Sequence, residues 1–63
     1  MLSSRAGITH IVWVEGNRIK LKTLPAATET IVGNGQLPTV LTTTDGHALV
    51  AWEKDGRVYT RRM

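Results

Sequence analysis

The apolar residues of this chain occur in short runs rich in Val, Ile and Thr, which Gly, Asn and Asp separate. Such runs are typical of strands, and no stretch shows the period of an amphipathic helix. The turn dipeptides are Gly16-Asn17, Asn34-Gly35, Asp45-Gly46 and Asp55-Gly56. Asn-Gly and Asp-Gly favour tight hairpins because both residues tolerate a positive φ. The pattern predicts an all-β, antiparallel chain with strands near 8–15, 18–24, 30–32, 39–44, 47–54 and 57–62.

The predicted strands differ in how many of their faces are apolar. In the strand near 47–54, Val50 and Trp52 point to one face and Leu49 to the other. The strand near 8–15 also has apolar residues on both faces, so both strands are expected to be covered on two sides. The strand near 18–24 places Ile19 and Leu21 on one face and basic residues on the other, a half-buried pattern. Each unit therefore runs from a buried strand through a two-residue turn to a more exposed strand.

The two tryptophan-bearing segments form an internal repeat. Trp52 follows Trp13 at an offset of 39 residues (52 − 13). At this offset, without a gap, the matched pairs are Gly7/Gly46, Ile11/Val50, Arg18/Arg57, Ile19/Val58, Lys22/Arg61 and Leu24/Met63. A period of about 40 residues with short strands in each unit is that of a β-propeller blade.

The second repeat resembles a known family. The stretch LPTVLTTTDGHALVAWEKDGRVYTRRM resembles a blade of the sialidase-like (BNR-type) β-propellers, and ITHIVWVEGNRIKLKTL repeats its second half. The matching features are Pro38, Gly46, Ala51-Trp52, Asp55-Gly56 and the strand near 57–62. The Asp-box of sialidases, Ser-x-Asp-x-Gly-x-Thr-Trp, is absent. The resemblance implies a propeller fold and a polar or carbohydrate ligand.

We interpret residues 1–63 as a single β-repeat unit. Residues 7–24 form a partial blade hairpin, 25–37 a connector with a short outer strand, and 38–63 a three-strand blade portion. The chain then holds about one and a half blades, whereas closed propellers have about four to eight. We expect it to complete a ring with further copies of itself or with a longer propeller chain. The residues expected to pack between blades are Trp13, Trp52, Val50 and Ile11.

The length and composition of the chain also favour association with other chains. A chain of 63 residues buries only about 60% of its unfolded surface and needs reinforcement. It has no cysteine, so disulfides and thiolate metal sites are excluded. His10 and His47 lack the neighbouring ligands of a metal site, and no cofactor is expected. Self-assembly or a partner chain is therefore the expected reinforcement.

The candidate ligand-binding residues are Arg57, Tyr59 and Arg61. Their spacing places all three on one face of one strand, where a cation can stack on the ring and an anion can bind. The acidic residues lie in turns, at strand ends or in the connector, so no catalytic residue is predicted. The sequence thus predicts a non-catalytic structural or ligand-binding module.

Two other functions use the same residues. The net charge of +3 fits a small basic β-barrel that binds nucleic acid through Arg, Lys and stacked aromatic rings. A glycosidase-type hydrolase assembled from several chains is the other alternative. No apolar stretch has the length of a signal peptide or a membrane span. A membrane partner is not expected, and a cytoplasmic location follows if the chain is complete.

Overall fold

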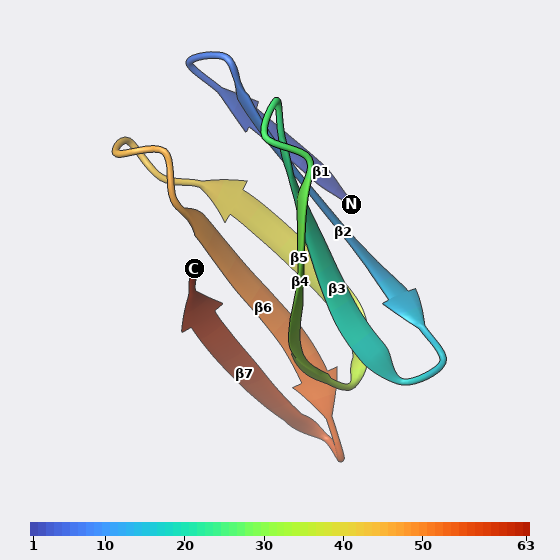
Figure 1. Cartoon of the computed structure of the whole chain (residues 1–63). Helices are drawn as coiled ribbons and strands as arrows, with labels where there is room; N and C mark the ends of the chain where they lie inside the picture. The colour runs from blue at the N-terminus through green and yellow to red at the C-terminus, as the bar shows by residue number, and fades with distance from the viewer.

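The protein is an all-β structure of two antiparallel sheets (Figure 1). The computed structural model describes residues 1–63, and it contains no helix that could cross a membrane. The seven strands are β1 (Leu2–Arg5), β2 (Ile8–Glu15), β3 (Arg18–Leu24), β4 (Thr28–Asn34), β5 (Gln36–Thr42), β6 (Ala48–Lys54) and β7 (Arg57–Arg62). The first sheet has the order β1-β2-β3-β4 and the second β5-β6-β7. The predicted all-β, antiparallel class is confirmed, and the alternative of a closed barrel is wrong.

Two of the four predicted dipeptides form two-residue turns between paired strands. Asp55 and Gly56 join β6 to β7 with φ values of 54° and 77°. A positive φ at both central residues is the requirement of a type I′ turn, whose twist matches that of the flanking strands. Gly16 and Asn17 join β2 to β3, and only Gly16 has a positive φ. The prediction of a hairpin at Asn34-Gly35 is wrong, because these residues link β4 of one sheet to β5 of the other, and Asp45-Gly46 lies within a longer connection between β5 and β6. The bounds of β2, β3 and β7 agree with the predicted strands.

The first sheet is larger than the predicted hairpin. The sequence predicted nothing at Leu2–Arg5, yet this segment pairs with β2 through a two-residue turn at Ala6 and Gly7. The predicted outer strand at 30–32 is the centre of a longer strand, β4, which pairs with β3 along its length. The segment expected to be a partial hairpin with a connector therefore forms a complete four-stranded sheet.

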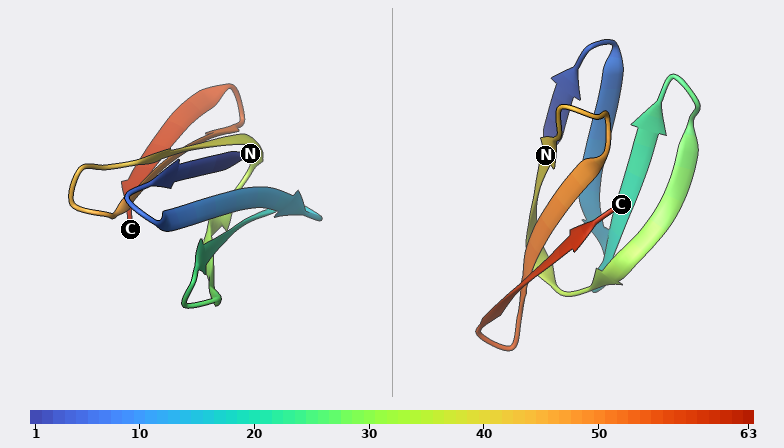
Figure 2. Two further views of the ribbon diagram at one scale, coloured as in Figure 1. Left: turned by 90° about the horizontal axis from the view of Figure 1, so that it is seen from above. Right: turned by 90° about the vertical axis from the view of Figure 1, so that its left-hand side faces the viewer.

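The two sheets pack against each other mainly where β5 of the second sheet lies beside β2 and β1 of the first sheet (Figure 1). Each sheet is twisted, so that the axis of its last strand is inclined to the axis of its first strand (Figure 2). The core lies between the sheets and draws residues from both of them: Val12, Ile19, Leu21, Val32, Val40, Ala48, Val50 and Trp52.

The two sheets repeat the same strand register. The second and third strands pair Trp13 with Lys20 in one sheet and Trp52 with Tyr59 in the other, which preserves the offset of 39. The first strands pair with the second strands at nearly the same positions: Leu2 faces Ile11 and Val40 faces Val50, so the offset between the first strands is 38 instead of 39. The sequence repeat thus corresponds to the same order and pairing of three strands, with a shift of one residue in the first strand. Only β4 has no counterpart in the second sheet.

Each second strand is covered on one face only. In β6, Val50 and Trp52 are buried toward the first sheet, while Leu49 on the opposite face is exposed. In β2, Val12 is fully buried toward the second sheet, while Trp13 on the opposite face is half-buried. The sequence predicted cover on both sides of these strands. In the single chain, one apolar face of each sheet lacks that cover.

Candidate functional site

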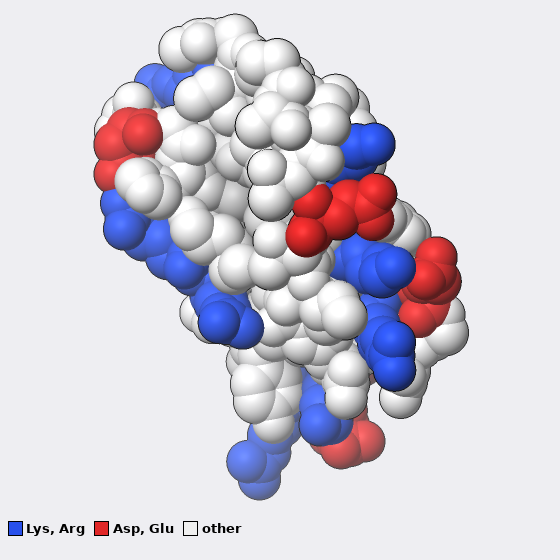
Figure 3. All heavy atoms as spheres, in the orientation of Figure 1, with Lys and Arg blue, Asp and Glu red and all other residues white.

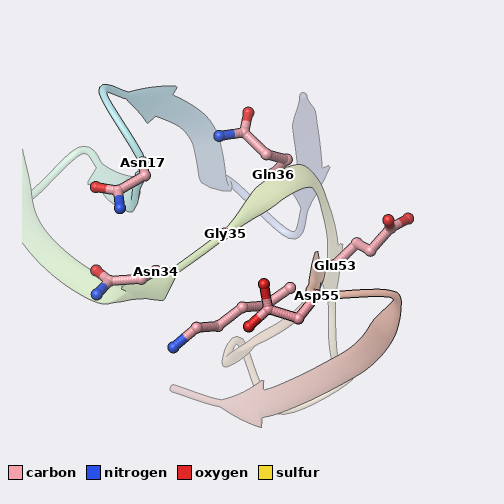
Figure 4. A pocket seen from close by; sticks show the side chains of 7 residues that line it. Asn17, Asn34, Gly35, Gln36, Glu53 and Asp55 are labelled. Atoms are coloured by element: carbon pink, nitrogen blue, oxygen red, sulfur yellow. The ribbon is translucent and has the colours of Figure 1, made fainter.

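A polar pocket lies at one end of the molecule, where three connections meet. These are the β2–β3 turn, the link from β4 to β5 and the β6–β7 turn (Figure 4). The pocket has a volume of about 240 Å³. Its lining residues are Asn17, Asn34, Gly35, Gln36, Glu53, Lys54 and Asp55. No apolar side chain lines it, so it offers hydrogen bonds and charge but no apolar surface.

Gly35 fixes the backbone that crosses this pocket from one sheet to the other. Its N–H donates a hydrogen bond to the carbonyl oxygen of Asn17 at 2.8 Å. A Cβ at Gly35 would lie 2.4 Å from the carbonyl oxygen of Glu53 and 2.6 Å from the Trp52 side chain. The residue also has a φ of 150°, which L residues rarely adopt. Only glycine therefore fits at this crossing.

The pocket side chains offer both donors and acceptors. The amides of Asn17 and Asn34 lie on one side of the hollow, and Glu53 points away from them (Figure 4). Lys54 and Asp55 bring opposite charges from the β6–β7 turn. None of these groups is a histidine, cysteine or hydroxyl, so the pocket holds no pair of nucleophile and base of the Ser-His kind. The sequence prediction missed this site because its lining comes from three separate connections.

The predicted ligand residues lie together on one face of β7, and two of them contact other parts of the fold. The ring of Tyr59 stacks on Trp52, with centroids 6.1 Å apart and planes inclined by 19°. Nη1 of Arg61 donates a hydrogen bond to the carbonyl oxygen of Val32 in the first sheet, at 2.9 Å. Arg57 is exposed beside the turn. Tyr59 thus packs on its neighbour within the second sheet, Arg61 bonds across to the first sheet, and the role of all three residues in ligand binding stays a prediction.

The four residues expected to pack between blades divide into two pairs. Trp52 and Val50 lie in the core between the two sheets. Trp13 and Ile11 are half-buried on the opposite face of the first sheet, which no other part of the chain covers. The residues that the repeat makes equivalent therefore have different surroundings within one chain.

A cluster of charged side chains lies in the β5–β6 connection. Asp45 accepts a hydrogen bond from the Thr43 hydroxyl, lies 3.3 Å from Nδ1 of His47 and pairs with Arg62 of β7. The Thr43 hydroxyl above all, with His47 and the charge of Arg62, holds the pKa of Asp45 well below its usual range. Because the hydroxyl donates to the aspartate rather than to the histidine, this is not the arrangement of a catalytic triad. The cluster ties the end of β7 to the loop.

His10 is buried in a network of hydrogen bonds between the sheets. Its Nδ1 lies 3.0 Å from Oγ1 of Thr42. Oγ of Ser3 accepts hydrogen bonds from both the backbone N–H and the hydroxyl of Thr42, each at 2.9 Å. Burial, and to a smaller extent the charge of His47, lowers the pKa of His10 below its ordinary value of 6.5. The network is satisfied with a neutral imidazole, and it links β1 and β2 to β5.

We expect the free energy of unfolding to fall as the pH drops below 6.5. The folded state resists protonation of His10, whereas the unfolded chain takes up this proton at the ordinary pKa of 6.5. Protonation therefore favours the unfolded state, by up to about 1.4 kcal/mol per pH unit for one proton. Urea unfolding between about pH 7.5 and pH 5 measures this slope across the range where histidine titrates.

A matched pair of variants assigns the slope to one residue. His10→Gln should flatten the dependence, since glutamine keeps a hydrogen-bonding group near Thr42 without titrating. His47→Gln, at an exposed position in the β5–β6 connection, should retain most of it. Equal slopes in His10→Gln and the unmodified chain would contradict the assignment.

Comparison with known proteins finds no relative of this chain. No family model, curated protein or solved structure matches the chain. The resemblance to sialidase-like blades therefore stays a prediction from the sequence. The features of the chain that bear on its function are the repeat, the packing of the two sheets and the sheet faces that remain uncovered.

Proposed function

We propose that this chain is a non-catalytic structural segment of a β-propeller and acts only within a closed ring. Its two sheets correspond to two consecutive blades, the second of which lacks an outer strand. The observation that carries the proposal is the repeated register, in which Trp13 pairs with Lys20 as Trp52 pairs with Tyr59. Two sheets with one register that pack face to face are the elements of a radially repeated architecture.

The order of the strands supports this proposal. In both sheets the strands follow the chain order, as in a meander of consecutive hairpins. The last strand of the first sheet, β4, continues through the single residue Gly35 into the first strand of the second sheet. β5 then lies beside β1 and β2 (Figure 1). The chain thus returns from the outer edge of one sheet to the inner edge of the next, as it does between propeller blades.

The proposal sets the size of the ring. Closed propellers have about four to eight blades, and each chain supplies two sheets, so a ring holds about two to four copies. β7 is the edge strand of the second sheet, and all of its residues are exposed in the single chain. The arginines at both of its ends, Arg57 and Arg62, are the kind of charged residue that protects an exposed edge from non-specific pairing.

Native mass spectrometry at micromolar concentration tests the proposal. We expect species with the mass of two to four chains of 6.9 kDa. Because assembly stabilises the folded chain by mass action, Tm should also rise with protein concentration. A compact monomer whose cooperative unfolding does not depend on concentration would overturn the proposal.

A further inference from the structure

We propose that the two open sheet faces are complementary, so that a second copy of this chain docks head to tail. The Trp13 face is the outer face of the first sheet and includes apolar Leu2, Ile11 and Trp13 and charged Glu15, Arg18, Lys20, Lys22 and Glu29. The Val58 face is the outer face of the second sheet and includes Leu41, Leu49, Ala51, Glu53, Val58 and Arg62. This inference rests on the proposed function and names the contact that would build the ring.

The Trp13 face repeats one side of the interface that already exists between the two sheets. At the offset of 39, Trp13 corresponds to Trp52 and Ile11 to Val50, and both counterparts lie in the core. Leu2 is 60% exposed, whereas Val40, which is paired equivalently in β5, is only 6% exposed. The apolar positions of this face thus have the pattern of a surface that packs on another sheet.

The Val58 face repeats the other side of the same interface. Val58 is 75% exposed, whereas its counterpart Ile19 is fully buried against the second sheet. Leu49, which is exposed, corresponds to the buried His10, and the half-buried Ala51 corresponds to the fully buried Val12. The Trp13 face is therefore equivalent to the side that the second sheet contributes to the existing interface, and the Val58 face is equivalent to the side that the first sheet contributes. A second copy that docks on either face repeats this interface.

The net charges of the two faces differ. The Trp13 face carries Arg18, Lys20 and Lys22 on β3, and the register also places Glu15 and Glu29 on it, opposite Arg18 and Lys22. Its net charge is therefore +1 (3 − 2). On the Val58 face, Glu53 forms no ion pair, whereas Arg62 pairs with Asp45. Two Trp13 faces placed together would bring like net charges together, whereas a Val58 face offers the unpaired carboxylate of Glu53.

Figure 3 shows one side of the molecule, on which groups of charged side chains are separated by areas of uncharged residues. Exposed apolar residues on both faces, Leu2 and Val58 among them, are the kind of surface that marks an interface. Because the two faces differ, the contact is heterologous and repeats from copy to copy until the ring closes.

Two charge substitutions at exposed positions test the pairing. Leu2→Glu blocks the Trp13 face, and Val58→Lys blocks the Val58 face. Neither side chain is buried in the single chain, so both variants should keep the fold, which circular dichroism checks. Ala26→Glu and Thr44→Lys introduce the same charges at exposed positions in the β3–β4 turn and the β5–β6 loop, outside both faces. These controls should assemble as the unmodified chain does.

Native mass spectrometry of each variant alone and of their equimolar mixture measures how many chains each complex contains. We expect each variant alone to be a monomer. We expect the mixture to give a dimer with one copy of each variant, because the Val58→Lys copy keeps its Trp13 face and the Leu2→Glu copy keeps its Val58 face. A mixture that stays monomeric up to about 1 mM, where even weak complexes form, would overturn the inference.

Other results separate this inference from the proposed function. If Val58→Lys alone assembles while Leu2→Glu does not, the Trp13 faces pair with each other, and head-to-tail docking is wrong. If both variants assemble as the unmodified chain does, the contact lies elsewhere, for example at the sheet edges, and the inference is again wrong. In both cases the chain still assembles, and the proposed function survives. An unmodified chain that is monomeric at every concentration overturns both.

Discussion

Trp52→Ala should remove most of the free energy of unfolding of the single chain. Trp52 is buried in the core, Tyr59 stacks on its ring, and a Cβ at Gly33 would lie only 2.8 Å from it. Such close packing on both sides leaves a large cavity when the ring is removed, and a Trp→Ala change in a core costs about 3–5 kcal/mol. A domain of 63 residues has a total stability of about 3–9 kcal/mol. The free energy lost in Trp52→Ala is therefore comparable with the total stability of the domain.

Trp13→Ala is the matched control for this prediction. Trp13 is the equivalent residue of the repeat, but it is only half-buried on an open face. Its removal should cost about 1–2 kcal/mol, less than full burial of a large apolar side chain. Urea unfolding followed by far-ultraviolet circular dichroism measures both variants, at low concentration so that association contributes little. Equal destabilisation by the two changes would contradict the unequal surroundings.

The strands that the sequence predicted well are those in which local patterns agree. In β3, apolar and basic residues alternate, and the structure buries Ile19 and Leu21 while Arg18 is exposed. The dipeptide Gly16-Asn17 after β2 and the dipeptide Asp55-Gly56 after β6 fix where the next strand begins. Side-chain alternation and turn chemistry act over a few residues, so they can be read without knowledge of the tertiary structure.

The features that the sequence did not predict depend on contacts between distant segments. Leu2–Arg5 has one large apolar residue and forms a strand because β2 offers it an edge to pair with. The pocket is lined from three connections that lie apart in the sequence. The hydrogen bond from Arg61 to a backbone carbonyl of the first sheet also joins residues that lie far apart in the sequence. No local pattern carries these contacts.

The uncovered apolar faces of β2 and β6 differ from what the sequence predicted. The sequence predicted apolar cover on both faces of β2 and β6, and the chain covers one face of each. Apolar residues such as Leu49 and Val58 are exposed, although the equivalent positions of the first sheet are buried. A sequence that keeps apolar residues at uncovered positions is typical of a surface that packs in an assembly. This is the physical basis of the proposed ring.

Gly35→Ala is expected to have the second largest effect, through the link between the sheets. The new Cβ would overlap the carbonyl oxygen of Glu53 at 2.4 Å, and the φ of 150° is unfavourable for alanine. Backbone strain of this kind costs about 1–3 kcal/mol. Overlap with packed atoms adds about 1–3 kcal/mol. The oxygen belongs to the backbone of β6, so relief of the overlap requires the link between β4 and β5 to move away from β6.

Gly56→Ala separates strain from overlap. Gly56 also has a positive φ, of 77°, but a Cβ there would meet no atom within 4 Å. This variant should therefore cost only the strain of a left-handed residue, about 1–2 kcal/mol. The difference between the two variants in urea unfolding reports the close approach of Gly35 to the backbone of β6. Gly35→Ala and Gly56→Ala with equal losses would show that Gly35 is required for its φ alone, and not for this close approach.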